Sequence, residues 1–199
     1  MPSRRWTLAA TILASTMAFI DSTVVNIAIP VLQRSIGATV TDAQWIVDAY
    51  LIVLSSLLLA GGALGDQLGR RRVFMAGIAL FAVASIGCGA AGSPRLLIIA
   101  RAVQGLGAAL LVPGSLAIIA ATYPVEERGR AIGTWSALTS LANVAGPLLG
   151  GWLVQSFTWR AAFYINVPIA IVTLAITWRA MPPDKRDGAE VKVDWWGSL

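Results

Sequence analysis

Three ionisable residues stand inside long apolar stretches of the chain: Asp21, Asp48 and Arg101. A charged side chain at the centre of a membrane helix costs about 2.5–3.5 kcal/mol, so each of these residues needs a partner or a water-filled cavity. A buried carboxyl group near a cation can take up and release protons, because burial and the cation act on its proton affinity in opposite directions. The three residues are therefore candidates for proton or substrate coupling. Asp48 also lies close to Trp45 and the expected membrane surface, where a solvated acid is an open alternative.

Asp21 and Arg101 are expected at similar depths in the membrane. Asp21 precedes Pro30 by nine residues, and Arg101 follows Pro94 by seven. With a rise of 1.5 Å per residue, they lie about 14 Å and about 10 Å below the expected outer ends of their helices. We interpret them as two residues of one central cavity. A structural ion pair that holds two helices in register is the alternative, and the sequence leaves both open.

Polar residues accompany both side chains. Ser22 and Asn26 belong to a polar stripe on the helix of Asp21, and Gln104 follows Arg101 by one helical turn. A helix surrounded by lipid would not carry such a stripe, so we expect these residues to face protein or water and to line the cavity. Helix packing alone accounts for the same pattern, and that alternative is also open.

The composition excludes a soluble protein and most enzymes. Of the 199 residues, 57% are hydrophobic and 13% are charged, against about 45–50% and about 25% in ordinary soluble domains. The chain has no His and one Cys, which excludes His-based catalysis, His/Cys zinc sites and intrachain disulfides. We therefore expect no enzyme, no metal and no cofactor. The net charge is +5, and the basic residues lie between apolar runs. We therefore expect them to set membrane orientation rather than to bind nucleic acid.

Six stretches are long enough to cross a bilayer core of about 30 Å. They cover residues 8–32, 43–64, 73–91, 96–122, 131–154 and 161–180. None shows the ten-residue alternation of an outer-membrane barrel, so we predict an all-α membrane protein with six transmembrane helices. The arginines before the first stretch give it a superficial likeness to a twin-arginine signal, but no convincing cleavage site follows.

The cations predict how these helices are oriented. If the N-terminus is cytoplasmic, eleven Lys and Arg residues fall inside and three fall outside, with Arg101 in a span. This bias predicts a multi-pass protein of the cytoplasmic membrane with both termini inside. Residues 182–199 are then a cytoplasmic linker that follows the six-helix bundle of residues 1–181.

The loop after the second span carries a dense pattern of glycines and charges. Glycines permit a tight turn and close helix approach, while an acid followed by arginines can form a charged latch at the membrane surface. The pattern resembles the loop signature of the major facilitator superfamily. Its residues are Gly62, Gly65, Asp66, Gly69, Arg70 and Arg71.

Further matches extend this resemblance over essentially the whole chain. Residues 19–30 and 101–108 are similar to the first- and fourth-helix motifs of the fourteen-helix drug/proton antiporter branch, and residues 159–168 to the start of its sixth helix. The fifth-helix antiporter motif is matched by Gly146, Pro147, Gly150 and Gly151. Read physically, these residues permit a bend and a close approach, so a kinked packing helix is as open as a dedicated antiport element.

The resemblance implies a mechanism as well as a fold. It implies alternating access by two six-helix bundles, each built from two inverted three-helix repeats. It implies Asp21 as the membrane acid linked to protons, Arg101 as the coupling arginine, and Asp66 with Arg70 as a cytoplasmic gate. The expected function is proton-coupled export of amphipathic or cationic small molecules.

The chain supplies six helices and stops where a seventh is expected, so we expect a fragment whose partners are the lipid bilayer and a missing C-terminal bundle. Two alternatives to multidrug export are left open: an exporter of a narrow metabolite, such as an amino acid or a self-made antibiotic, and a non-transporting membrane fragment. No set of nucleophile and base supports an enzyme.

Overall fold

The computed structural model describes residues 4–184, which form helices joined by short loops, with no strand among them. Six segments are long and apolar enough to cross a membrane, the last one built from two helices in succession. The helices are α1 (Arg4–Ile36), α2 (Val40–Leu68), α3 (Arg70–Ala90), α4 (Pro94–Thr122), α5 (Val125–Ser156), α6 (Ala161–Tyr164) and α7 (Asn166–Ala180). The all-α class with six membrane-length segments is thus confirmed.

The first helix is longer than predicted. Pro30 lies inside α1, which continues to Ile36 and ends at Gly37, whose φ of 68° lies in the left-handed region. A proline removes one backbone hydrogen bond, and membrane helices tolerate this loss when neighbouring groups satisfy the freed carbonyl. Taking Pro30 as the outer end of the helix was therefore wrong, and Asp21 lies near the middle of α1.

The last membrane segment covers Ala161–Ala180, the range that the sequence predicted, and a single residue within it separates two helices. The break falls at Ile165, between α6 and α7. Pro168 stands in the first turn of α7 and lacks the N–H that would bond the carbonyl of Tyr164. The interruption places Asn166 at the start of α7, in the interior of the bundle.

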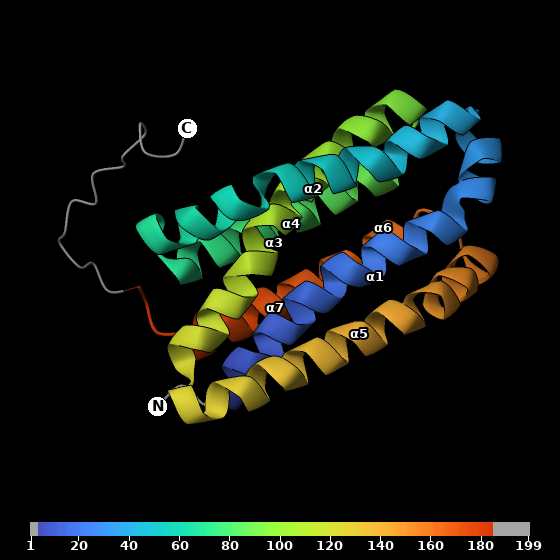
Figure 1. Cartoon of the computed structure of the whole chain (residues 1–199). Helices are drawn as coiled ribbons and strands as arrows, with labels where there is room; N and C mark the ends of the chain where they lie inside the picture. The colour runs from blue at the N-terminus through green and yellow to red at the C-terminus, as the bar shows by residue number, and fades with distance from the viewer. Residues whose placement is uncertain (1–3, 185–199) are drawn as a thin grey trace.

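The helices form one bundle in which α4 packs mainly against α2 and α3, while α1 packs against α5, α7 and α4. The first turn of α1 and the end of α7 lie at the same end of the bundle, at the left in Figure 1. That end also holds the α2–α3 and α4–α5 loops. We call it the charged end, because Arg4, Asp66, Arg70, Glu127 and Asp184 gather there.

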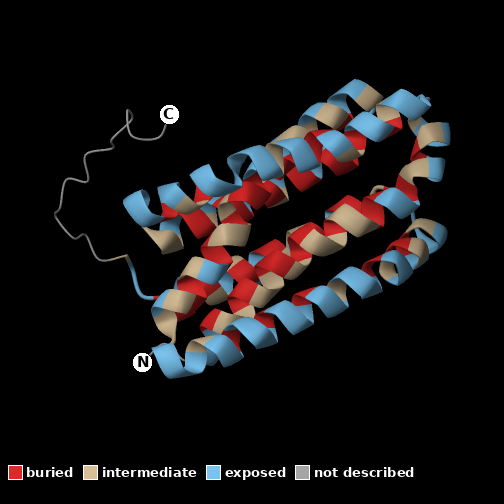
Figure 2. Cartoon of the chain, viewed as in Figure 1, coloured by how far each residue is buried: buried red, intermediate tan, exposed pale blue. Residues whose placement is uncertain are grey.

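Small residues let the helices approach closely. A Cβ at Gly61 of α2 would overlap the Ala109 carbonyl of α4, and a Cβ at Gly107 of α4 would lie 2.7 Å from the Phe81 nitrogen of α3. Buried residues face the interior, whereas the outer faces of α2 and α5 are largely exposed (Figure 2). Close packing of this kind is how membrane helices associate when lipid removes the hydrophobic drive.

The repeat symmetry expected from the resemblance stays a prediction. Of the expected linker 182–199, residues 182–184 are described, and the remainder lies outside the described part of the chain.

Candidate functional site

Asp21 is buried in the middle of the bundle, with 1% of its surface exposed. Its carboxylate accepts three hydrogen bonds from three different side chains. Oδ2 pairs with Nη1 of Arg101, while Oδ1 accepts from Nε2 of Gln104 at 2.9 Å and from Nδ2 of Asn166 at 2.8 Å. All three contacts come from donors, so the observed geometry suits an ionised carboxylate.

Arg101 is equally buried and is held from three sides. Its guanidinium donates to Gln104 Oε1 at 2.7 Å and to the Ile46 carbonyl at 3.1 Å, besides the ion pair with Asp21. It also lies over the Tyr50 ring, 4.2 Å from the ring centre. A buried guanidinium needs this many partners because its dehydration is otherwise uncompensated. Helices α1 and α4 therefore meet at this pair, as the polar faces predicted.

The cluster extends to α3 and α7. Ser85 of α3 accepts hydrogen bonds from Gln104 Nε2 at 2.8 Å and from Asn166 Nδ2 at 3.2 Å. Cys88, also on α3, donates to Gln104 Oε1 at 3.5 Å between donor and acceptor. Five helices thus contribute to one buried polar network: α1, α2, α3, α4 and α7. We call this set the buried cluster: Asp21, Tyr50, Ser85, Cys88, Arg101, Gln104 and Asn166.

A hollow of about 230 Å³ lies beside the buried cluster. Ser22 and Asn26 of α1 line it together with Asn143 of α5, and Arg101 forms part of its wall. Asp21 and Gln104 are not among the lining residues. Arg101 therefore stands between the sealed carboxylate and the hollow. Of the residues expected to line a cavity, Ser22 and Asn26 do so, whereas Gln104 is completely buried within the cluster.

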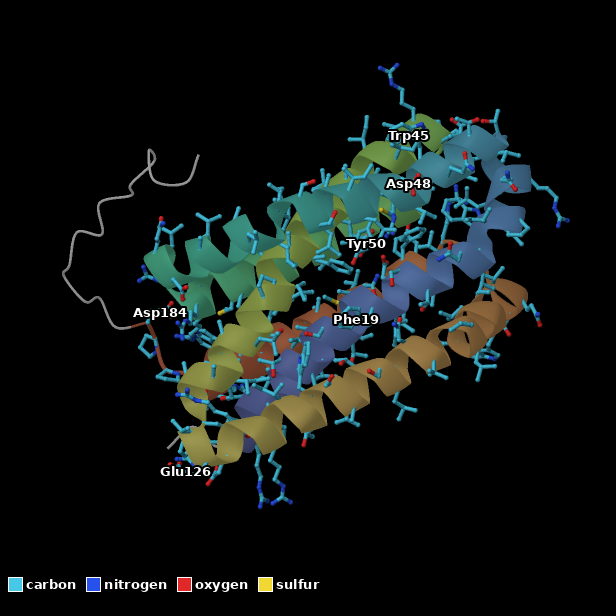
Figure 3. The ribbon with its side chains drawn as sticks, in the orientation of Figure 1. Phe19, Trp45, Asp48, Tyr50, Glu126 and Asp184 are labelled. Carbon is cyan, nitrogen blue, oxygen red and sulfur yellow. The ribbon has the colours of Figure 1, made fainter. Side chains whose placement is uncertain are left out.

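Asp48 does not join Asp21 and Arg101. It is exposed on α2, while Tyr50 of the same helix faces the space between α2 and α1 (Figure 3). Each step along a helix turns the side-chain direction by about 100°, so two residues that are two positions apart lie on nearly opposite faces. Within residues 4–184 Asp48 forms no ion pair.

At the charged end, Asp66 and Arg70 form an ion pair at 2.8 Å, with 61% and 41% of their side chains exposed. Arg70 also donates to the Ala117 carbonyl of α4 at 3.2 Å. Gly65 is buried next to Arg70, and Gly62 packs against Pro113. The predicted latch between Asp66 and Arg70 is thus seen as a contact that joins α2, α3 and α4.

Arg71 and Gly69 meet a residue that the sequence analysis did not single out, Asp184. Its carboxylate accepts from the backbone N–H groups of Arg71 at 3.0 Å and Arg72 at 3.1 Å, so it caps the start of α3. Gly69 has a φ of 102°, and a Cβ there would overlap Asp184. The Arg71 guanidinium donates to the Trp178 carbonyl of α7 at 2.8 Å.

The α4–α5 loop at the same end contacts the start of α1. Arg4 pairs with Glu127 at 3.1 Å, and the Tyr123 hydroxyl donates to the Arg4 carbonyl at 2.9 Å. Partial burial raises the pKa of Tyr123 above its usual value, and the carboxylate of Glu127 adds to this effect. Tyr123 therefore stays a neutral donor at physiological pH.

The fifth-helix glycines have two different surroundings. Cβ atoms at Gly146 and Gly150 would collide with Thr23 and Val24 of α1, so these two glycines let α5 pack closely on α1. Gly151 has no atom near its Cβ position, and Pro147 is exposed. The packing interpretation of this motif therefore has direct geometric support at Gly146 and Gly150.

Four residues of the buried cluster were missed by sequence reasoning: Tyr50, Ser85, Cys88 and Asn166. Ser85 lies in an apolar stretch with no charged neighbour, so nothing marked it. Asn166 stands directly before Val167 and Pro168, and a buried amide next to a helix-interrupting proline was a signal that could have been used.

Comparisons with known proteins agree with the fold and the motifs. A family model described as Major Facilitator Superfamily matches residues 11–195. The puromycin resistance protein pur8 of Streptomyces alboniger is 41% identical over all of this chain and 39% of its own length. The multidrug resistance protein Stp of Mycobacterium tuberculosis H37Rv is 41% identical over 86% of this chain and 32% of its own length. The chain therefore spans between about a third and two fifths of the length of these relatives.

Solved structures show the same architecture. A bacterial homologue of the human lysosomal transporter Spinster, in an inward-facing and occupied conformation, superposes with a TM-score of 0.78 at 23% identity. The match covers 94% of this chain and 46% of that one. The fold, six membrane-length helices and the family match together make this chain a multi-pass membrane protein that belongs to the Major Facilitator Superfamily.

Proposed function

We propose that this chain supplies the N-terminal half of a proton-coupled exporter of small molecules, with Asp21 as the group that binds the proton. The observation that carries the proposal is the buried ion pair of Asp21 and Arg101 beside a polar hollow. Ionisable residues inside a membrane protein are costly, and they commonly mark the pathway of an ion or a substrate.

Coupling follows if the proton and the substrate favour different conformations. Protonation of Asp21 removes the charge that Arg101 neutralises, so the guanidinium at the wall of the hollow loses its ionic partner. A substrate in the hollow then meets a different wall depending on whether Asp21 holds a proton. Each ligand thereby changes the affinity for the other by the same factor, as thermodynamic linkage requires.

The lining of the hollow suggests the kind of substrate. Ser22, Asn26 and Asn143 are neutral, Tyr50 adds an aromatic ring, and Arg101 adds a positive charge that Asp21 neutralises. Neutral polar groups beside an aromatic ring suit amphipathic compounds, cationic ones included. The name of Stp favours broad multidrug export. The names of the puromycin and methylenomycin A resistance proteins favour the second candidate, export of one antibiotic or metabolite.

A second helical bundle is proposed as the partner that completes the transport path. The outer faces of α2 and α5 are largely exposed, and relatives that match this chain are about two and a half to three times as long. A second bundle packed on these faces would enclose the hollow. Alternating access would then be a rocking of the two bundles, with Asp66 and Arg70 as a gate at the charged end.

We also propose that the charged end is cytoplasmic. Most of the chain's cations fall at or beyond that end, as the positive-inside rule requires. Single cysteines replacing Arg34 or Arg95, in a Cys88→Ser background, should react with an impermeant thiol reagent in intact cells. A cysteine replacing Glu126 should react only after lysis, and the reverse pattern would overturn the orientation.

The coupling proposal is tested on the complete reading frame that contains this chain, in membrane vesicles. Addition of substrate should release protons in the wild type, as recorded with a pH-sensitive dye. Asp21→Asn, which keeps the size of the side chain, should reach the membrane and lose this release. Glu126→Gln removes an exposed carboxylate at the charged end and serves as the matched control. Full proton release in Asp21→Asn would remove Asp21 from the mechanism.

A further inference from the structure

Asn166 has a buried oxygen with no hydrogen bond. Its side chain is 1% exposed, its Nδ2 donates to Asp21 and Ser85, and its Oδ1 has no partner within the described part of the chain. A buried amide oxygen without a partner is unfavourable, so it is available to accept a hydrogen bond from a donor that is brought to it.

The nearest other side-chain acceptors, on Gln104 and Ser85, have no free lone pair. Gln104 Oε1 already accepts from Arg101 Nη1 at 2.7 Å and from Cys88 Sγ at 3.5 Å. Ser85 Oγ already accepts from Gln104 at 2.8 Å and from Asn166 at 3.2 Å. Each of these oxygens has two lone pairs, and both are taken. Among these neighbours, Asn166 Oδ1 is the acceptor with free lone pairs.

Protonation of Asp21 changes the kind of hydrogen-bond partner that its carboxyl group requires. An ionised carboxylate needs donors, whereas a carboxylic acid has an O–H that needs an acceptor. A half-turn of the Asn166 amide about its Cβ–Cγ bond exchanges Nδ2 and Oδ1, two groups of nearly equal size. After that turn Oδ1 faces Asp21 and can accept a hydrogen bond from its O–H, while Nδ2 no longer donates to Ser85. The proton comes from hydronium in the aqueous phase, whose O–H bond breaks as the O–H bond on Asp21 forms, and the turn of the amide itself breaks no covalent bond.

We propose that Asn166 is a positioning residue for proton coupling, whose amide reverses when Asp21 takes up a proton. This inference rests on the proposed role of Asp21. It assigns to α7 a part in coupling, because Asn166 stands at the break between α6 and α7. Pro168, at the third position of α7, already lacks one backbone N–H, so a bend at this point breaks few further hydrogen bonds.

Few other charged or titratable groups face Asp21. Arg101 of α4 contacts it directly, and Tyr50 of α2 and Cys88 of α3 lie close enough to feel its charge. The described residues of α5, α6 and α7 bring no titratable side chain into contact with it. A change at Asn166 therefore acts on Asp21 without disturbing another ion pair.

Two variants of the complete reading frame test the proposal, with substrate-induced proton release measured over a series of pH values. Asn166→Leu removes both the donor to the ionised carboxylate and the acceptor for the carboxylic acid. Because the hydrogen bond to the charged form is the stronger of the two, the variant should hold the proton more tightly. The pH of half-maximal release should rise by about one unit, a tenfold change in proton affinity. Asn166→Asp keeps the shape but replaces the Nδ2 donor by a second acceptor oxygen and adds a like charge beside Asp21, so it should raise the midpoint further.

Thr173→Val is the matched control. Thr173 is buried on the same helix, but its hydroxyl bonds to the Ile169 carbonyl of its own helix at 2.7 Å and does not touch Asp21. The control should keep the wild-type midpoint. A purely structural role for Asn166 would lower the amount of folded protein in all states and leave the midpoint unchanged.

The outcomes separate the two proposals. If the wild type releases protons and Asp21→Asn does not, the role of Asp21 stands. An unchanged midpoint in Asn166→Leu and Asn166→Asp would then overturn the role of Asn166 alone. If Asn166→Leu fails to reach the membrane, the isosteric Asn166→Asp decides the question by the same measurement. If the wild type releases no protons, the proposed function itself fails.

Discussion

Two Asp–Arg pairs of this protein use the same chemistry in opposite surroundings. Asp21 and Arg101 are at most 1% exposed, whereas Asp66 and Arg70 keep 61% and 41% of their side chains exposed. Water solvates each partner of the second pair, so little depends on its formation. The first pair is buried among protein hydrogen-bonding groups, so each member depends on the other. Burial, rather than the type of residue, makes one pair a candidate for proton coupling and the other a surface latch.

The two pairs also differ in what surrounds them. The inner pair, Asp21 and Arg101, is held mainly by the side-chain amides of Gln104 and Asn166, besides the backbone carbonyl of Ile46. The outer pair is held by the backbone, through the Ala117 carbonyl, and lies next to the Asp184 cap. Side-chain partners can respond to a proton, whereas backbone partners keep a fixed geometry. This difference is why we propose proton coupling for the inner pair and a mechanical role for the pair at the charged end.

The largest effect should come from breaking the inner pair at its cation. Arg101→Leu leaves a buried carboxylate without its counter-ion, and such a change costs about 3–5 kcal/mol. A large drop of the melting temperature of the detergent-solubilised protein is expected. Arg95→Leu, which removes an exposed cation from the first turn of the same helix, should leave the melting temperature nearly unchanged.

A second substitution in the same background sharpens this result. Combining Asp21→Asn with Arg101→Leu removes both charges, so part of the lost stability should return. If the single Arg101→Leu variant melts like the wild type, the pair is not the buried, mutually dependent unit described above.

Gly69→Ala should have the next largest effect, at the charged end. Gly69 has a φ of 102°, a conformation that residues other than Gly adopt at a cost of about 1–3 kcal/mol. The added methyl group would also displace Asp184 from the start of α3. Thermal unfolding measures the loss. Gly129→Ala, at an exposed helical glycine with no atom near its Cβ position, is the control and should not destabilise.

Breaking the outer pair should matter less. Asp66→Asn removes an exposed partner, and such pairs contribute about 0–1 kcal/mol. Arg70 keeps its hydrogen bond to the Ala117 carbonyl and is free to meet water. The melting temperature should therefore change by far less than in Arg101→Leu, and added salt should reduce the difference further. An effect as large as that of Arg101→Leu would mean that burial does not separate the two pairs.

The sequence predicts the helices well because hydropathy and charge determine them almost alone. Pro94 and the loop glycines mark the helix ends that the structure shows, whereas Pro30 does not, since its helix continues to Ile36. Whether a proline ends or only bends a membrane helix depends on tertiary neighbours, which a single segment does not reveal. The separation of α6 from α7 at Ile165 was not predicted, for the same reason.

The site was partly predictable. Charged residues in apolar runs stand out, so Asp21 and Arg101 were found, and their contact follows from the polar faces of two helices. Ser85 and Asn166 are neutral residues that a membrane helix carries at little cost, and only the packing of α3 and α7 brings them to Asp21. Asp184 caps α3 from more than a hundred residues away, a contact that no local pattern encodes.

The smallest effect is expected at Asp48, whose carboxylate belongs to neither of the two pairs. It is exposed on α2, and no described cation pairs with it, so its charge is already solvated or faces a partner outside the described residues. Asp48→Asn should therefore leave the pH dependence of substrate-induced proton release as in the wild type, while Asp21→Asn abolishes the release. Both variants replace the same side chain by the same isostere, so their difference isolates burial and the Arg101 contact. Loss of proton release in Asp48→Asn would show that an exposed carboxylate on α2 shares the coupling role, and the distinction between buried and exposed acids would have to be abandoned.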